Sequence, residues 1–234
     1  MEVNTNGPVA LSRQLTALKR RGCNVLVVND APGAEPVCRA LLGAAGLDRR
    51  YVFVPTTTSV ADALARCTLG SVDPDRLGVV DASTAGRTRS ATISAGPAAA
   101  PDPDAVWYSE VADLRDLPTV LRQAGRHLER LTPPDPGPGD VRFCLESLDP
   151  FFDEVSTDHL LRFVHLLTAT IRRLGGLGHF HVAAGTADHD VRVLEPLFDA
   201  TVTVRADDEL RAHRWTIHET GYETDWLPLD GLEP

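Results

Sequence analysis

Residues 24–46 read NVLVVNDAPGAEPVCRALLGAAG: an apolar run, a turn that contains Gly and Pro, and a segment that favours a helix. This is the layout of a phosphate-binding loop, in which a buried strand leads through a glycine-rich turn into a helix. The residue types that hold a phosphate are missing from the turn. The stretch therefore predicts the fold, and it leaves open whether a nucleotide binds.

The turn departs from the phosphate-loop pattern at its charged positions. In G-x-x-x-x-G-K-[ST], glycines let backbone N–H groups surround the phosphates, the lysine supplies positive charge and the hydroxyl holds Mg²⁺. Asn29 and Ala34 stand at the two glycines, Glu35 at the lysine and Pro36 at the hydroxyl. The candidate vestigial nucleotide site comprises Asn29, Asp30, Gly33, Ala34, Glu35 and Pro36.

These replacements act against a phosphate. Two unit charges 4 Å apart interact by about 4 kcal/mol at an effective dielectric of 20, and Glu35 turns that attraction into repulsion. Pro36 removes a backbone donor together with the hydroxyl. We therefore expect no cofactor, neither ATP nor Mg²⁺ bound in the usual way, although the helix N-terminus could accept a weaker anion.

Outward from this stretch, apolar runs alternate with amphipathic segments. We expect strands at 23–28, 51–55, 77–81, 141–148 and 179–184, and helices at 35–45, 58–67, 118–131, 157–174 and 191–198. This alternation predicts an α/β fold with a doubly wound, mainly parallel sheet and helices on both faces. Residues 200–205 and 212–219 alternate like an antiparallel hairpin at the sheet edge.

Turn-forming and capping residues suggest where the helices begin and end. Thr57 or Thr58 could cap the helix that follows them, and Ser156 could cap the long helix after it. Gly46 is placed to end the helix that starts at Glu35.

The chain reads as one α/β domain over residues 1–234. Residues 1–21 form an N-terminal extension with an amphipathic helix at 8–21, and residues 84–106, rich in Ala, Pro, Gly and Ser, form a long loop.

The excess of acidic residues predicts a protein of a salt-adapted cytoplasm. The chain has 33 acidic residues, one lysine (Lys19) and a formal net charge of −10. An acidic, Lys-poor surface suits solubility in concentrated salt, and it disfavours nucleic acid and anionic membranes as partners. No apolar run approaches the ~20 residues of a membrane span.

The four cysteines show no metal-binding spacing. Cys23, Cys38, Cys67 and Cys144 lie in or beside apolar segments and form no C-x-x-C pair. They are expected to be buried, reduced thiols rather than a structural zinc site or a disulfide framework.

Two other families share the layout and fail on particular residues. A phospho-receiver domain would use Asp30 and Asp81, but it needs a lysine near its last strand, and Lys19 precedes the first strand. A dinucleotide site expects an acidic residue ending the second strand, which here runs into Pro55 and threonines.

Several segments resemble the RecA/KaiC-like P-loop superfamily, and more closely a haloarchaeal RecA-like group of unassigned role with degenerate P-loops. They are NVLVV at 24–28, RLGVVDAS at 76–83, VRFCLESL at 141–148, the helix and Gly pair at 158–178, and LFDATVTVR at 197–205. The resemblance covers roughly residues 20–220. It implies a RecA-like domain, but the ATPase activity does not carry over at the P-loop positions.

The resemblance also gives Glu146 a role. In the superfamily, an acidic residue at the end of this strand supports Mg²⁺ through water. Without the hydroxyl partner, Glu146 would form only part of such a site. The alternative is that Glu146 caps or pairs at the strand end.

Histidines near the C-terminal half suggest a metal hypothesis. His179 and His181 alternate in a strand and so face the same side. Asp188, His189 and Asp190 follow after one turn. A zinc site needs three or four converging ligands. The alternative is a half-buried strand facing a polar loop.

Three functions remain. The first is a non-catalytic regulatory or scaffold module that binds a protein partner, with a homo-oligomer as one form. The second is a divergent ATP- or GTP-binding enzyme with a rearranged phosphate site. The third is a metal-dependent hydrolase built on His179 and His181.

Overall fold

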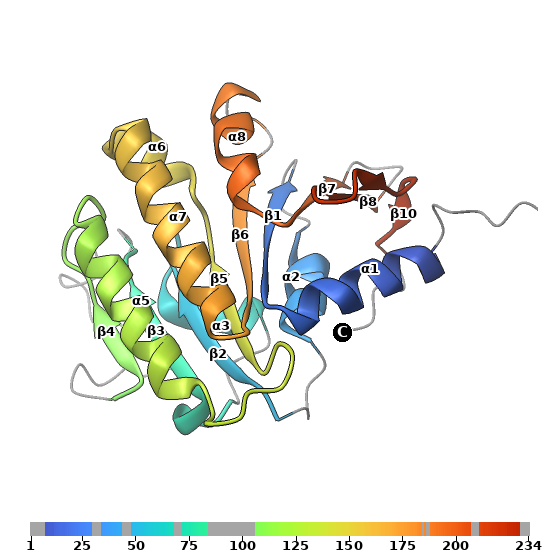
Figure 1. The fold of residues 1–234 in the computed structure, drawn as a ribbon. Helices are drawn as coiled ribbons and strands as arrows, with labels where there is room; N and C mark the ends of the chain where they lie inside the picture. Colours follow the sequence, from blue (N-terminus) through green and yellow to red (C-terminus); the bar gives the residue numbers. More distant parts are fainter. Residues whose placement is uncertain are drawn as a thin grey trace, which may run out of the picture.

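The computed structural model describes residues 8–29, 34–43, 48–67, 72–83, 106–183, 185, 188–206 and 211–229. One ten-stranded sheet runs through them in the order β10-β8-β7-β1-β6-β5-β2-β3-β4, with β9 beside β8 (Figure 1). The strands are β1 (Cys23–Asn29), β2 (Arg50–Val54), β3 (Leu77–Asp81), β4 (Tyr108–Glu110), β5 (Val141–Leu145), β6 (Leu177–Ala183), β7 (Ala200–Ala206), β8 (Arg211–Ile217), β9 (Tyr222–Glu223) and β10 (Leu227–Pro228).

The sheet is parallel from β7 across to β4, as the alternation of strands and helices predicts. Strands β7 and β8 form an antiparallel hairpin, and the short β9 and β10 pair with β8, also antiparallel. The predicted α/β fold with a C-terminal hairpin is thus confirmed, and the short β10 lies outside the hairpin.

Helices cover both faces of the sheet (Figure 1). They are α1 (Pro8–Arg20), α2 (Glu35–Leu42), α3 (Val60–Arg66), α5 (Leu117–Leu131), α6 (Asp149–Glu154), α7 (Thr157–Arg173) and α8 (Asp188–Leu194), with 3₁₀ turns η1 (Pro74–Arg76) and η3 (Glu195–Leu197). Helices α5, α6, α7 and α8 pack on one face through a single large apolar core. On the other face, α1 and α2 pack over β1, β7 and β8, and α2 and α3 pack over β2 and β3.

The N-terminal helix belongs to the domain rather than standing apart from it. Leu11 and Leu18 are buried in the same core as Val25 and Trp215. On the opposite face, the apolar stripe of α7 is buried as its spacing predicts.

Two helix boundaries differ from the sequence-based expectation. Helix α2 ends at Leu42, because Gly43 takes a φ of 89°, which a helix does not allow; the expected end at Gly46 is wrong. Helix α3 begins at Val60 and is capped by Ser59, whose Oγ accepts from the Asp62 amide, 3.2 Å away. The expected cap by Thr57 or Thr58 is wrong.

Further differences concern short elements. Strand β5 ends at Leu145, and the acidic segment after it forms its own helix, α6. Ser156 stands at the N-cap position of α7 without a side-chain capping bond. Strands β4, β9 and β10 have no counterpart among the expected elements. The predicted loop at 84–106 falls, apart from residue 106, outside the described residues.

Among the described residues, no helix has the length and apolarity needed to cross a bilayer.

One buried histidine links α5 to the sheet. His127 packs so closely over Gly78 of β3 that a Cβ at residue 78 would lie 2.8 Å from the His127 side chain. Its Nε2 lies 3.0 Å from Ser109 Oγ of β4. Burial, with a smaller effect of Arg130 and Arg126, lowers the pKa of His127 from 6.5 to about 4.

We expect His127 to make the protein less stable in acid. Between pH 6.5 and 4 the unfolded chain takes up a proton that folded His127 does not, so this contribution is complete above pH 6.5 and is lost as the pH falls. The slope of the unfolding free energy against pH reports how many more protons the unfolded chain binds than the folded one. His127→Gln should lower this difference by about one proton in this window. Urea unfolding across the pH range measures it. His159→Gln, at an exposed position of α7, is the control, and an equal slope change in both variants would contradict the prediction.

Candidate functional site at the carboxyl ends of the strands

A cavity of about 330 Å³ opens at the carboxyl ends of β1, β5 and β6. Ligands of open α/β sheets bind in the crevice outside these strand ends. Asn29 from β1, Ala34 and Glu35 at the start of α2, and Glu146 after β5 all line the cavity. The structure therefore brings together the two segments that the sequence proposes as parts of one nucleotide site.

Of the remaining residues of that predicted site, the structure describes only Pro36. Pro36 occupies the first turn of α2 and is half-buried. Asp30 and Gly33 lie outside the described residues. No side chain in the α2 segment of the wall supplies the cation or the hydroxyl that a phosphate loop requires.

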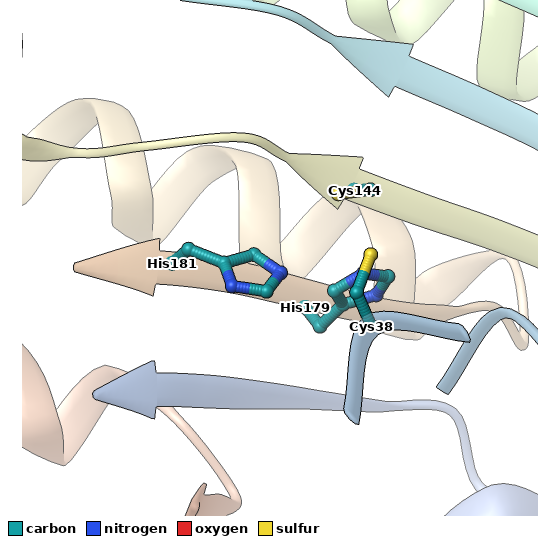
Figure 2. Close-up of side chains that lie close together, drawn as sticks. All are labelled: Cys38, Cys144, His179 and His181. Carbon is teal, nitrogen blue, oxygen red and sulfur yellow. The ribbon is translucent and has the colours of Figure 1, made fainter. Parts of the chain in front are cut away.

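A cluster of cysteine and histidine side chains lies at the floor of the cavity; Cys38, Cys144 and His181 line the cavity, and His179 is fully buried beside them. Cys38 of α2, Cys144 of β5, and His179 and His181 of β6 place one ligand atom each within 4.8 Å of one another, and all four residues are buried (Figure 2). Cys38 Sγ lies 3.3 Å from His179 Nε2 and 3.4 Å from Cys67 Sγ.

Strand register assembles this cluster. Cys144 of β5 is the direct partner of His179 in β6, so the two side chains emerge at the same depth on the same face. His181 follows on that face by alternation. The intervening Phe180 and the neighbouring Phe143 point to the opposite face, where their rings lie 5.3 Å apart. Cys38 reaches the cluster from α2, which covers this side of the sheet.

Burial keeps the cluster uncharged when no ion is bound. Burial lowers the pKa of His179 well below its usual value and that of His181 to about 4. Burial also raises the pKa of Cys144 to about 11. A hydrogen bond with Cys144 is the main cause that raises the pKa of Cys38. The imidazoles are therefore neutral and the thiols protonated at neutral pH.

The cluster revises the expectation for the metal candidates. His179 and His181 do share one face, as predicted. The side chains of Asp188, His189 and Asp190 lie outside the described ones, so the predicted role of His189 stays a prediction. All four cysteines are buried, as predicted, and no disulfide joins them. Spacing along the chain did not predict that Cys38 and Cys144 meet beside the two histidines.

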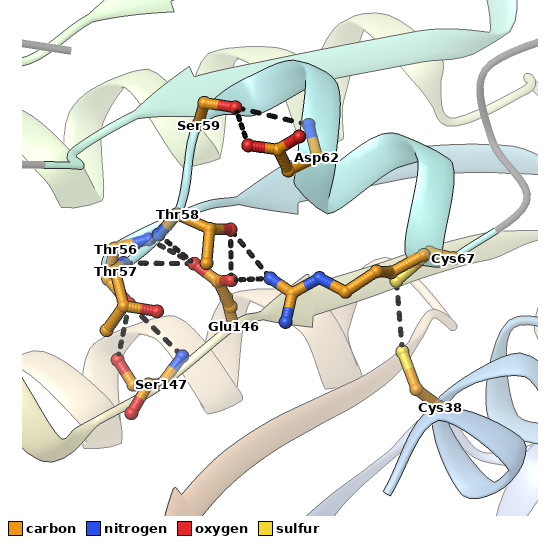
Figure 3. Close-up of polar contacts among 10 residues, drawn as sticks. Cys38, Thr56, Thr57, Thr58, Ser59, Asp62, Cys67, Glu146 and Ser147 are labelled. Carbon is orange, nitrogen blue, oxygen red and sulfur yellow. Dashed lines mark hydrogen bonds and ion pairs between the residues drawn. The ribbon is translucent and has the colours of Figure 1, made fainter. Parts of the chain in front are cut away.

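Glu146 is enclosed by protein donors (Figure 3). Its Oε2 accepts the backbone N–H groups of Thr56, Thr57 and Thr58 at 2.9, 3.0 and 3.2 Å. Its Oε1 accepts the Thr58 hydroxyl at 2.5 Å and pairs with Arg66 of α3. The side chain is only 10% exposed. Glu146 therefore braces the turn between β2 and α3, as the capping alternative predicts.

The pKa of Glu146 follows from these bonds. Burial alone would raise it, but the hydrogen bonds from the Thr58 hydroxyl and from the three backbone N–H groups outweigh burial and lower it. The carboxylate is thus ionised, and its lone pairs are directed at protein donors. Few remain for a hydrated metal ion.

A second carboxylate joins the ends of β5 and β6. Asp149 accepts a hydrogen bond from the Ser147 hydroxyl, and both its oxygens lie 3.1 Å from the Ala183 amide. Ser147 in turn is tied to Thr56 by backbone contacts of 2.9 and 3.2 Å to the Thr56 hydroxyl. The strand ends around the cavity are consequently locked by polar groups that already have partners.

The fold and the cavity define an α/β protein with a doubly wound sheet and a cavity at the strand carboxyl ends. A model of DUF7504, a family of unknown function, matches residues 22–204, and the chain belongs to this family. The matched region extends from the start of β1 into β7, so it contains every residue of the cavity wall. A search of the curated proteins finds no match.

We predict that Glu146 contributes more to stability than its ion-pair partner. Glu146→Gln weakens several charge-assisted hydrogen bonds at a buried position and should cost about 1–3 kcal/mol of unfolding free energy. Arg66→Met should cost less, about 0–1 kcal/mol, because the Arg66 side chain is 45% exposed. Denaturant unfolding of both variants measures the difference. Equal costs would mean that the ion pair, and not the threonine turn, is the main interaction.

Proposed function

We propose that this chain is a non-catalytic RecA/KaiC-like regulatory or scaffold module with a degenerate nucleotide site, which acts by binding another protein. The observation that carries the proposal is the chemistry of the cavity wall at α2. Where a triphosphate requires a cation, the wall has Glu35, and the next residue, Pro36 in the first turn of α2, has no hydroxyl to offer.

The negative charge of the cavity wall also supports a site that does not bind nucleotide. Glu35, Glu146 and Asp149 bring three carboxylates to the cavity, and Arg66 is the cation among its described lining residues. Arg66 is already paired with Glu146. A nucleotide triphosphate entering the cavity would meet net negative charge at short range, which opposes its binding.

The hydrogen bonds of Glu146 support the proposal that the site no longer assists Mg²⁺. A residue that assists Mg²⁺ through water must leave oxygen lone pairs open to that water. The Glu146 carboxylate instead receives hydrogen bonds from three consecutive backbone amides and a hydroxyl, and pairs with a guanidinium. The cavity thus retains the position of a nucleotide site and lacks its ligands.

The alternative is a divergent ATP- or GTP-binding enzyme. One observation favours it: Asn29, Glu35 and Glu146 still surround a single cavity at the strand carboxyl ends. The volume of about 330 Å³ falls at the lower end of ligand pockets. Measuring whether nucleotide binds separates the two functions.

We expect no stabilisation of the native chain by Mg-ATP or Mg-GTP. Thermal unfolding in molar KCl with millimolar nucleotide is the measurement, because a ligand at 100 times its Kd stabilises a protein by about 2.7 kcal/mol. A clear rise in Tm would overturn the proposal and favour the NTPase alternative.

A repaired loop sharpens this test. The combined variant Asn29→Gly, Ala34→Gly, Glu35→Lys and Pro36→Thr restores G-x-x-x-x-G-K-T, and we expect its Tm to rise with Mg-ATP. Glu129→Lys, on the exposed surface of α5, makes the same change of charge away from the cavity and should not respond. If the repaired variant folds and binds nothing, the RecA-like interpretation of the loop is wrong.

The proposed setting is the cytoplasm of a salt-adapted archaeal cell, with a protein as the partner and neither nucleic acid nor membrane. The acidic composition supports this setting. The partner is a second copy of the chain or a different protein. Light scattering in molar KCl, followed by co-purification at the same ionic strength, distinguishes the two.

A further inference from the structure

We propose that Cys38, Cys144, His179 and His181 form a structural Zn²⁺ site that fastens α2 to the centre of the sheet. The four residues come from three elements, and their ligand atoms already lie within 4.8 Å of one another. The inference is independent of the proposed function, since it concerns the floor of the cavity and not its phosphate-facing wall.

The geometry is close to that of a bound site. Tetrahedral zinc with Zn–S of about 2.3 Å and Zn–N of about 2.0 Å separates its ligand atoms by roughly 3.3–3.8 Å. Cys38 Sγ and His179 Nε2 are 3.3 Å apart. All the other ligand-atom pairs lie within 4.8 Å, at most about 1.5 Å beyond the tetrahedral separations.

The chemistry of the four side chains suits zinc. Two thiolates and two neutral imidazoles are a common structural ligand set for Zn²⁺. Two negative charges balance the dication, so the complete site would be neutral, as a buried position requires. Four protein ligands close the coordination sphere, which is the arrangement of a structural rather than a catalytic zinc.

Without an ion, the cluster leaves a buried polar atom without a hydrogen bond. Nε2 of His181 is buried and has no hydrogen-bond partner among the described residues. A buried polar atom without a partner costs free energy, and a metal ion at this position would remove the cost. Buried cysteines alone are ordinary core residues, but two buried imidazoles beside them are not explained by apolar packing.

Cys67 is the competing partner of Cys38. Their sulfurs are 3.4 Å apart, and Cys67 lies just past the end of α3 at the cavity wall. A disulfide between them would consume the Cys38 ligand, so it excludes the proposed site. The experiments therefore need freshly reduced protein and a Cys67 variant.

Metal content of the full chain, purified without chelator and under reducing conditions, is the first measurement. We expect about one zinc per chain by elemental analysis and native mass spectrometry, given four ligands for one ion. After removal of zinc, Co²⁺ should produce the visible bands of a tetrahedral site and a thiolate-to-cobalt charge-transfer band.

Variants test the ligand set. Cys144→Ser and His181→Asn should each reduce retained zinc several-fold, and Cys144→Ser should also weaken the charge-transfer band. Cys67→Ser should retain zinc. Cys23→Ser is the matched control, because Cys23 is equally buried at the start of β1 but lies outside the cluster. Circular dichroism identifies variants that fail to fold, and for these the Co²⁺ spectrum of the native chain decides.

Three results would overturn the proposal. One is reduced, folded protein that neither retains zinc nor gives a tetrahedral Co²⁺ spectrum. Another is loss of zinc in Cys67→Ser while Cys144→Ser and His181→Asn keep it. The last is a Cys38–Cys67 disulfide in metal-free protein isolated under native conditions.

Discussion

The pairing of β6 with both β1 and β5 is the constraint on which the cavity depends. Seven consecutive residues of β6 pair in register with β1, and four pair with β5. Side chains alternate between faces, so a slip of one residue would turn His179 and His181 toward α7 and move Phe180 to the cavity side. The apolar core under α7, with Phe143 and Phe180 in contact, opposes that slip and thereby fixes the depth and direction of the two histidines.

The polar groups around the cavity divide into two kinds. Near its mouth, Glu146 and Asp149 accept hydrogen bonds that tie together strand ends and turns. At its floor, thiols and imidazoles lie uncharged in an otherwise apolar environment. Carboxylates that brace the backbone have few lone pairs left for a ligand, whereas neutral soft donors are available to an ion. The cavity therefore combines a wall that carries Glu35 where a phosphate loop has its lysine with a floor that groups cysteine and histidine side chains.

The elements predicted from the sequence are those whose burial is periodic. Helix α7 and the hairpin β7–β8 repeat their apolar positions over several turns or pleats, and both are found as expected. Strands β4, β9 and β10 contain two or three residues each, too few for any period to emerge. They form because a neighbouring strand offers free backbone groups, and that information is absent from the local sequence.

The site could be predicted only in part for a related reason. Alternation places His179 and His181 on one face, and the strand–turn–helix layout places Asn29 and Glu35 at the cavity. The convergence of Cys38 with Cys144 depends on how α2 crosses the sheet, which no spacing along the chain encodes. Glu146 left two roles open, and the choice between them rests on Thr58 and Arg66, which lie far from it in sequence.

Among the described residues, the sheet ends on one side in β9 and β10, two residues each, and on the other in β4, three residues long. Such brief outer strands offer little backbone for another chain to extend the sheet by hydrogen bonding. Self-association of this protein by lateral strand addition is correspondingly disfavoured, even where the concentration of the chain is high. The helices that cover both faces of the described sheet offer side chains rather than backbone groups for contact with another chain.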